Sequence, residues 1–399
     1  MLKKSPFFDF FSQTEDVEFN QYLAGSLEDE DYIDWNGFLL PNDYDDAEAE
    51  YRAIRDACAI FDVSPLRKYR IQGTDAGSFL DHLVTRPPSG MPAMRGVYVV
   101  FCNEDGSLKD DAILHKYADD DYMLLPSDMD HSAYFAGLLQ RYGLEDISVD
   151  DCTYDWTGLA VQGPQSATVM QNMGFSGIEF LEPLAIRDFP FHGGSIRIAR
   201  MGFTADLGYE IWLKAGQQQA LEQAIQSARG SLDIAIPGYG LTALQACRLE
   251  GGFIVAGWDC STQADPNPGF ERSPFELGLG WLVNLDAADF VGKDALLKEK
   301  RNGSSYTLRS FTINDPRVPE DGAPLYAKVA DEDVEVGIIT CSSWSWDLDK
   351  MIGNASLESR YAAIKDAWTI LVGDTLSVRL SRGPLRSFER SKKVPAPIA

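Results

Sequence analysis

Carboxylates stand at two places in the sequence where they could take part in chemistry. Asp110 and Asp111 lie where a turn enters the apolar segment AILHKY, and Glu210 lies in the segment YEIWL beside Trp212. Because side chains alternate faces along a strand, only one of the two aspartates can face the interior, and the surrounding residues do not settle which one. Aspartates at turns and glutamates on edge strands are usually solvated, so these types alone do not establish a site.

The surroundings of Glu210 permit a more specific interpretation. A pterin ring presents two parallel donors, a ring N–H and an exocyclic amine, and a carboxylate can accept both side by side in a charge-assisted pair. Tyr209 and Trp212 are close in sequence and would offer aromatic surface for stacking. The segment is therefore compatible with recognition of a pterin.

The sequence lacks the patterns of several common enzyme classes. It contains no G-x-G-x-x-G after a strand, no G-x-x-x-x-G-K-[ST], no G-x-S-x-G and no H-E-x-x-H. Its 6 cysteines form no C-x-x-C pair, and its 4 histidines share no metal-ligand spacing. These absences disfavour dinucleotide oxidoreductases, P-loop NTPases and α/β-hydrolases, and we expect neither a metal site nor a disulfide framework.

The elements that would position the carboxylates mix meanders with helices. A strand is predicted over residues 68–73, and a helix is predicted to begin after the N-cap Thr74. A three-stranded meander follows, with Asp110 and Asp111 at the start of its second strand. There is no steady alternation of strand and helix, which favours an α+β fold over a doubly wound sheet.

The composition is that of an ordinary globular protein with a strong negative charge. The 399 residues are 45% hydrophobic and 24% charged, and the formal net charge is -26. Such a surface repels phosphate backbones and anionic lipids, so we expect neither nucleic acid nor a membrane as a partner. No apolar run approaches the ~18 residues of a membrane span, and the N-terminus does not resemble a signal peptide, which favours the cytoplasm as location.

A series of motifs then occurs in a recognisable order. They are FDVSP, YVVFCNEDGSLKDD, LAVQGPQS, RMGFTADLGYEIWL, CRLEGG, and SPFELGLGWLV with DFVGKDAL. Each is weak alone, but together and in this order they resemble the T-protein (aminomethyltransferase) family of the glycine cleavage system. The resemblance covers the chain except for its first 35 or so residues.

The resemblance implies a fold and an activity. The fold would have three lobes with a reduced folate in the middle and a C-terminal β-barrel-like domain. We therefore expect an N-terminal extension over residues 1–35, a two-lobed folate-binding region over 36–298 and the barrel-like domain over 299–399. The implied activity is transfer of a methyl or aminomethyl unit from a small-molecule donor to N5 of tetrahydrofolate.

The resemblance also implies roles for individual residues. Asp111 takes the position of the family's essential catalytic aspartate, and Glu210 that of its pterin-binding glutamate. Tyr98 and Phe203 match aromatic positions beside the pterin, and Leu66 matches an apolar contact, although ordinary core packing would explain the two aromatic residues as well. Asp111 could stabilise a positive charge on the folate or accept a proton from it, and the sequence leaves both roles open.

The chain departs from the family pattern at positions implied to face the donor. Pro65 replaces a histidine, Leu244 replaces an arginine, Ala256 replaces a tyrosine, and the family's C-terminal arginine has no clear counterpart. Replacing arginine by leucine removes a fixed charge and a fork of donors. This favours a small-molecule donor over an aminomethyl-lipoyl carrier, and CRLEGGFIVAG resembles demethylating relatives such as dimethylsulfoniopropionate demethylase.

Three other interpretations remain. The chain could be the aminomethyltransferase of glycine cleavage, acting on a lipoylated carrier protein. It could be a non-catalytic folate-binding protein, which the presence of Asp111 disfavours, or the folate-binding part of a flavin-linked oxidase. The Pro- and Asp-rich loop over residues 259–274 could be a substrate lid, a dimer contact or a solvated boundary.

Overall fold

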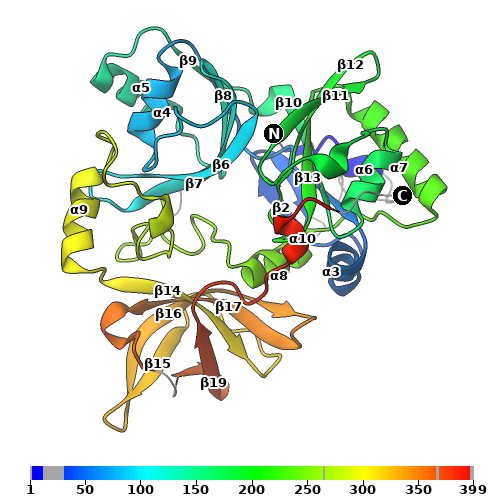
Figure 1. The fold of residues 1–399 in the computed structure, drawn as a ribbon. Helices are drawn as coiled ribbons and strands as arrows, with labels where there is room; N and C mark the ends of the chain where they lie inside the picture. Colours follow the sequence, from blue (N-terminus) through cyan, green and yellow to red (C-terminus); the bar gives the residue numbers. More distant parts are fainter. Residues whose placement is uncertain (1, 12–30, 264–265, 365–367, 396–399) are drawn as a thin grey trace.

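The computed structural model describes residues 2–11, 31–263, 266–364 and 368–395. In this part of the chain, two sheets with helices on their outer faces lie side by side, and a closed barrel lies below them (Figure 1). The strands of both sheets pair antiparallel with their neighbours, so neither sheet is built from parallel strand–helix–strand units. The predicted α+β class is therefore confirmed.

The first sheet has the order β11-β12-β13-β10-β4. Its strands are β4 (Ala59–Asp62), β10 (Trp156–Gln162), β11 (Ile186–Phe191), β12 (Gly194–Ala199) and β13 (Gly208–Lys214). The helices α6 (Ser166–Asn172) and α7 (Gln218–Leu232) cover its outer face (Figure 1). Apolar side chains of this face, such as Leu159, Ile198 and Ile211, are fully buried against Ile225 of α7, which forms the largest core of the molecule.

The second sheet has the order β6-β7-β8-β5-β9. Its strands are β5 (Tyr69–Gln72), β6 (Arg95–Cys102), β7 (Leu108–Ala118), β8 (Asp121–Pro126) and β9 (Ser148–Asp151), and its helices are α4 (Ala76–Leu83) and α5 (Ser132–Tyr142). The predicted meander and the strand before it are present. The predicted N-cap is wrong by one residue, because the cap of α4 is Asp75 and the Thr74 hydroxyl donates instead to Asp146, at 2.6 Å.

The barrel closes six strands in the order β14-β17-β16-β15-β18-β19. They are β14 (Tyr306–Ile313), β15 (Pro324–Val329), β16 (Glu332–Ser345), β17 (Lys350–Glu358), β18 (Trp368–Val372) and β19 (Asp374–Ser381). Closure removes the sheet edges, and buried side chains such as Phe311 and Leu357 fill the interior. The barrel needs glycine at position 353 because a Cβ there would lie 2.2 Å from the Cys341 carbonyl oxygen.

Further elements complete the described structure. They are β1 (Lys3–Lys4), α1 (Phe8–Phe11), β2 (Tyr32–Trp35), β3 (Phe38–Pro41), α3 (Ala47–Asp56), α8 (Leu241–Gly251), α9 (Lys293–Asn302) and α10 (Glu389–Lys392). Of these, β1, β2 and β3 form a small sheet in the order β1-β3-β2. Short 3-10 turns occur at Thr153–Asp155, Ile178–Phe180, Gly280–Leu282 and Ser359–Tyr361. Among these elements, α8 packs against both α3 and the barrel strand β16, so it joins the barrel to the rest of the molecule.

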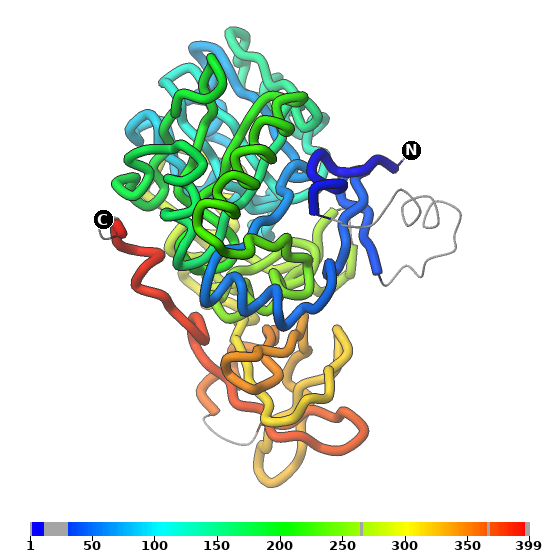
Figure 2. The backbone as a smooth tube through the Cα atoms, turned by 90° about the vertical axis from the view of Figure 1, so that its right-hand side faces the viewer, coloured from blue at the N-terminus to red at the C-terminus, as the bar shows by residue number. Residues whose placement is uncertain are grey.

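Segments near both ends of the chain pack into the first sheet's lobe. Phe7 is fully buried beside Ile60 and Leu159. The C-terminal segment leaves the barrel and runs back along the rest of the molecule (Figure 2), where the Arg390 guanidinium pairs with Asp206 at 2.5 Å. The expected domain limits at residues 35 and 298 remain a prediction. The segments around Phe7 and Arg390 lie outside residues 36–298 but pack against that region.

Candidate functional site

Asp111 and Glu210 lie on facing surfaces of the two sheets. Along β7, Asp111 and Ile113 are two residues apart and therefore share a face, as do Glu210 and Trp212 along β13. Ile113 and Trp212 belong to the same apolar cluster, so these two faces meet. Tertiary packing therefore brings together the two carboxylates that the sequence singled out, one from each sheet.

The two neighbouring aspartates have different surroundings. Asp110 is fully buried, and its carboxylate lies 2.7 Å from His131 Nε2 and accepts from the Ser127 hydroxyl at 2.9 Å and from the Asp111 backbone N–H at 2.8 Å. Asp111 points to the opposite face, toward the first sheet, and is partly exposed. The strand thus assigns Asp110 to a structural network and leaves Asp111 available for a ligand. The role of His131 was not predicted, since α5 supplies it and no spacing in the sequence signals it.

Asp111 is held by Tyr98 and carries an unusual pKa. The Tyr98 hydroxyl donates to Asp111 Oδ2 at 2.9 Å. Burial raises the pKa of Asp111 to about 7, the charge of Asp110 adds to the rise, and the Tyr98 hydroxyl and the Ala256 backbone N–H oppose it. A carboxyl that titrates near neutrality can accept a proton or supply negative charge, as general bases and electrostatic stabilisers do.

Glu210 has the environment of a binding group rather than of an exposed edge residue. On neighbouring strands it pairs with Ala160 and Ala199, whose small side chains leave space above the sheet. Burial raises the pKa of Glu210 to about 7, and the adjacent Trp212 opposes this rise. The indole N–H of Trp212 is itself buried and interacts with Glu210, although no hydrogen bond of normal geometry forms between them. A carboxylate beside an indole in an apolar setting is suited to binding a flat, polar ligand.

Leu66 and Phe203 are placed differently from each other. Leu66 packs partly buried in the cluster that also holds Trp212 and Ile113, so it lines the space between the carboxylates. Phe203 is 38% exposed and stacks on Phe253, with ring centroids 5.3 Å apart. Contacts thus join Tyr98 to Asp111 and Leu66 to Trp212, whereas the contact found for Phe203 is with another aromatic ring.

The loop that carries Phe203 is held by Gln162, a residue that the sequence did not single out. The Gln162 side chain accepts from the Thr204 hydroxyl at 2.8 Å and donates to the Met201 carbonyl at 3.2 Å. A Cβ at Gly202 or Gly208 would lie within 2.2 Å of the Gln162 amide, so a larger residue at either position would displace this side chain. The glycines of RMGFTADLG are the signal that could have indicated this close approach.

Two of the departures from the family pattern lie close to this region. Leu244 of α8 packs partly buried against an apolar cluster that includes Phe61 and Tyr239. The Ala256 side chain lies in a second cluster with Tyr98 and Cys260, while its backbone N–H faces Asp111. Both positions are therefore apolar neighbours of the site rather than charged parts of it.

The described residues were also searched for other kinds of site. They contain no group of three or more histidine, cysteine, aspartate or glutamate side chains arranged to hold a metal ion. Within the same residues, no helix combines the length and apolarity needed to cross a membrane.

Comparisons with known proteins identify the family of the chain. The family model of the GCVT N-terminal domain matches residues 29–287, which is more than half of the chain. The chain belongs to this T-protein family. The match includes both carboxylates and all of the motifs from FDVSP to CRLEGG, so the family resemblance predicted from those motifs is confirmed.

Relatives in this family match almost the full length of the chain. A protein of Thermoanaerobacter pseudethanolicus named aminomethyltransferase is 26% identical over 392 residues, covering 98% of this chain and 97% of the relative. One of the same name from Halothermothrix orenii is 28% identical and covers 93% and 96%. A third from Clostridium botulinum is 29% identical over 342 residues, covering 85% and 89%.

A solved structure establishes the fold independently. The glycine cleavage system aminomethyltransferase T from Bartonella henselae superposes with a TM-score of 0.80 and 22% identity, covering 99% of this chain and all of the other. The T-protein-like fold with its C-terminal barrel, expected from the motifs, is therefore confirmed.

Proposed function

We propose that this T-protein family member is a tetrahydrofolate-dependent enzyme that transfers a methyl or aminomethyl unit from a donor to N5 of tetrahydrofolate. One observation carries the proposal: Asp111 and Glu210 lie on the faces of two sheets that meet, and burial raises the pKa of each to about 7. Enzymes place carboxyls in such settings when the chemistry needs them, whereas structural carboxylates are usually paired or solvated.

In this proposal Glu210 recognises the pterin. Its two oxygens accept the parallel donors of the ring, and the low polarity around them strengthens both bonds. Leu66 and Trp212 provide apolar and aromatic surface for the ring. Tyr98 and Phe203 are assigned to the edges of the same site, Tyr98 through its bond to Asp111 and Phe203 by its match to the family pattern.

Asp111 acts at the reacting nitrogen. Bound tetrahydrofolate supplies the nucleophilic N5 amine that takes up the one-carbon unit. As N5 gains a bond to carbon, positive charge develops there and its proton must leave; the electron pair of the broken donor bond departs with the leaving group. Asp111 stabilises this charge and accepts the proton, while Tyr98 keeps the carboxylate oriented.

Two classes of donor are compatible with this chemistry. The apolar Leu244 in place of the family's arginine favours a small-molecule donor, since an anionic carrier loses a charged contact there. The name aminomethyltransferase of the relatives instead favours an aminomethyl donor, which the family resemblance assigns to a lipoylated carrier protein. Turnover with and without such a carrier separates the two, and either one would operate in the cytoplasm that the sequence predicts.

The pterin assignment predicts a loss of affinity in Glu210→Gln. The amide keeps one acceptor and places an N–H against a ring donor, which should cost roughly 1.5–3 kcal/mol, or about tenfold to a hundredfold in affinity for reduced folate. Calorimetric titration measures this change, with the exposed Glu335→Gln as a matched control. If Glu210→Gln binds folate as tightly as the wild type, Glu210 does not recognise the pterin.

The raised pKa of Glu210 predicts that folate affinity depends on pH. The ionised carboxylate accepts two donors, and the protonated form, which prevails below about pH 7, accepts fewer. Affinity for reduced folate should therefore increase as the pH rises through about 7 and then level off. The same titration repeated between pH 6 and 8 tests this, and the step should be smaller in Glu210→Gln. Affinity that falls with rising pH would argue against an ionised Glu210 in the complex.

A further inference from the structure

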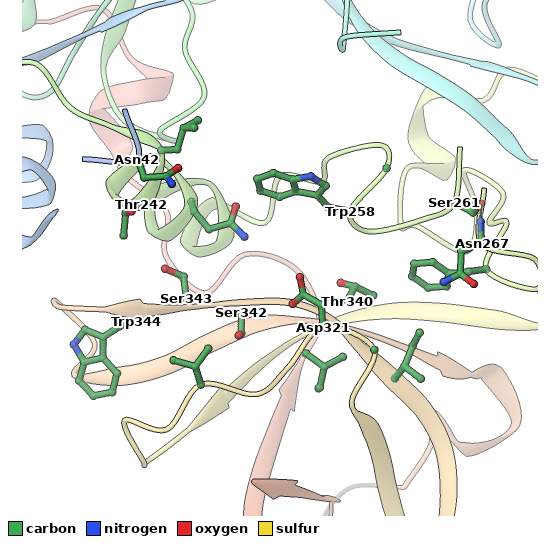
Figure 3. Close-up of a pocket in the computed structure, with 18 of the residues that line it drawn as sticks. Asn42, Thr242, Trp258, Ser261, Asn267, Asp321, Thr340, Ser342, Ser343 and Trp344 are labelled. Carbon is green, nitrogen blue, oxygen red and sulfur yellow. Dashed lines mark hydrogen bonds between the residues drawn. The ribbon is translucent and has the colours of Figure 1, made fainter. Parts of the chain in front are cut away.

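A second cavity lies between helix α8 and the barrel. Its volume is about 740 Å³, which suits a small molecule. The loop after α8 forms its upper wall and strand β16 its floor, so it lies outside the space between Asp111 and Glu210 (Figure 3). Its lining includes Gln245, Trp258, Phe270, Asp321, Thr340 and Ser342.

The charge around this cavity is unbalanced. Asp321 is the one charged side chain among the described residues that line it, and Asp321 makes no ion pair there. Behind the wall, Arg248 and Asp259 are buried and pair with each other at 2.7 Å, so their charges cancel. Burial and the charge of Asp259 raise the pKa of Asp321, and the charge of Arg248 opposes this rise. A cation in the cavity would balance the charge of the Asp321 carboxylate.

An aromatic ring faces this carboxylate. Trp258 is 50% exposed, a large fraction for an indole, and it projects into the cavity opposite Asp321 (Figure 3). The faces of tryptophan attract cations, and methylated cations, which are weakly hydrated, gain most from such a contact. The nearest guanidinium, that of Arg248, lies 5.6 Å from the Trp258 centroid and is already paired with Asp259. The remaining ring surface is available to a ligand.

The same loop connects this cavity to the candidate active site. The Ala256 backbone N–H faces Asp111, and the next two residues, Gly257 and Trp258, line the cavity. A ligand in the cavity would therefore contact residues that directly follow Ala256, whose N–H faces Asp111.

We propose that this cavity binds a small methylated onium cation, a quaternary ammonium or a sulfonium, between the Trp258 indole and the Asp321 carboxylate. The net charge of -26 would attract such a ligand from solution. The lining of this cavity includes neither Asp111 nor Glu210, and the binding site does not depend on the function proposed above.

Choline and 3,3-dimethyl-1-butanol are suitable probes because they share size and shape and differ by one charge. In calorimetric titrations of the full chain, choline should bind at least about tenfold more tightly than the neutral alcohol. Asp321→Asn and Trp258→Ala should each weaken choline binding, by about three- to thirtyfold, and should leave binding of the alcohol little changed. Asp349→Asn is a matched control, because Asp349 is exposed and has a left-handed backbone (φ 52°) that asparagine tolerates.

Folate titrations of the same variants separate the two proposals. Asp321→Asn should keep its affinity for reduced folate, and Glu210→Gln should keep its affinity for choline. If the wild type does not bind reduced folate, the proposed function is contradicted, whereas the proposed onium site is not. Equal affinities for choline and the alcohol, or choline binding that is unchanged in Asp321→Asn, would refute the onium site.

Discussion

Asp111→Asn is expected to lower the rate of one-carbon transfer by about 10²–10⁴-fold, the usual contribution of a general acid or base. The asparagine amide cannot accept the proton released at N5 and carries no negative charge to stabilise the nitrogen. Folate affinity should change much less, because Glu210 makes the specific contacts with the ring. Single-turnover measurements with saturating folate report the chemical step directly.

The matched control is Asp233→Asn, in which an exposed aspartate with a left-handed backbone (φ 50°) receives a residue that tolerates this conformation. It should keep the wild-type rate and stability. A rate within about threefold of the wild type in Asp111→Asn would show that Asp111 serves only to position the ligand, because the loss would then fall below that expected of a proton acceptor.

Asp259→Ala is expected to destabilise the protein by about 3–5 kcal/mol, the cost of leaving a buried charge unpaired. Asp259 is fully buried, pairs with Arg248 of α8, and accepts hydrogen bonds from Thr340 at 2.7 Å and Asn354 at 2.9 Å. Because these two partners belong to barrel strands, the carboxylate joins α8 to the barrel. Urea unfolding followed by far-UV circular dichroism measures the change.

A double-mutant comparison checks the cause of this loss. Arg248→Met combined with Asp259→Ala removes both charges, so it should be less destabilised than Asp259→Ala alone. If Asp259→Ala costs less than about 1 kcal/mol, the pair does not hold α8 to the barrel.

The same carboxylate gives stability a defined pH dependence. Burial alone would raise the pKa of Asp259, but the charge of Arg248 and the hydrogen bonds outweigh burial, and its pKa lies below the ordinary value of 3.8. A carboxyl whose pKa is lowered by folding stabilises the folded state above its unfolded pKa and loses this contribution as the pH falls through its folded pKa. The difference between the wild type and Asp259→Ala should therefore shrink below about pH 4.

Stability and chemistry are thus assigned to different carboxylates within the same part of the fold. Asp259 and Asp110 are fully buried and satisfied by several donors each. Asp111 and Glu210 are partly exposed and have fewer partners, and burial raises the pKa of each to about 7. Among the described residues, Asp321 at the second cavity forms no ion pair, and its pKa is also raised.

The sequence by itself determined the fold class and singled out two carboxylates as candidates for the site. Local alternation of apolar and polar residues predicted the meander, and the order of the motifs pointed to Asp111 and Glu210. The fold class and the meander were predicted correctly because they depend on residues that are close in the chain, whereas the roles of Asp111 and Glu210 stay predictions. The N-cap prediction at Thr74 failed because a distant residue, Asp146, takes up the hydroxyl.

Only the tertiary structure decided which aspartate of the pair is free and how each carboxyl titrates. His131 and Ser127 reach Asp110 from outside its hairpin, and the apolar layer that shields Asp111 and Glu210 is shared by two separate sheets. Trp258 and Asp321 likewise meet across a cavity between α8 and the barrel. Desolvation and charge balance depend on all atoms within several ångströms, whichever part of the chain supplies them, so neither can be read from the neighbours of a residue in sequence.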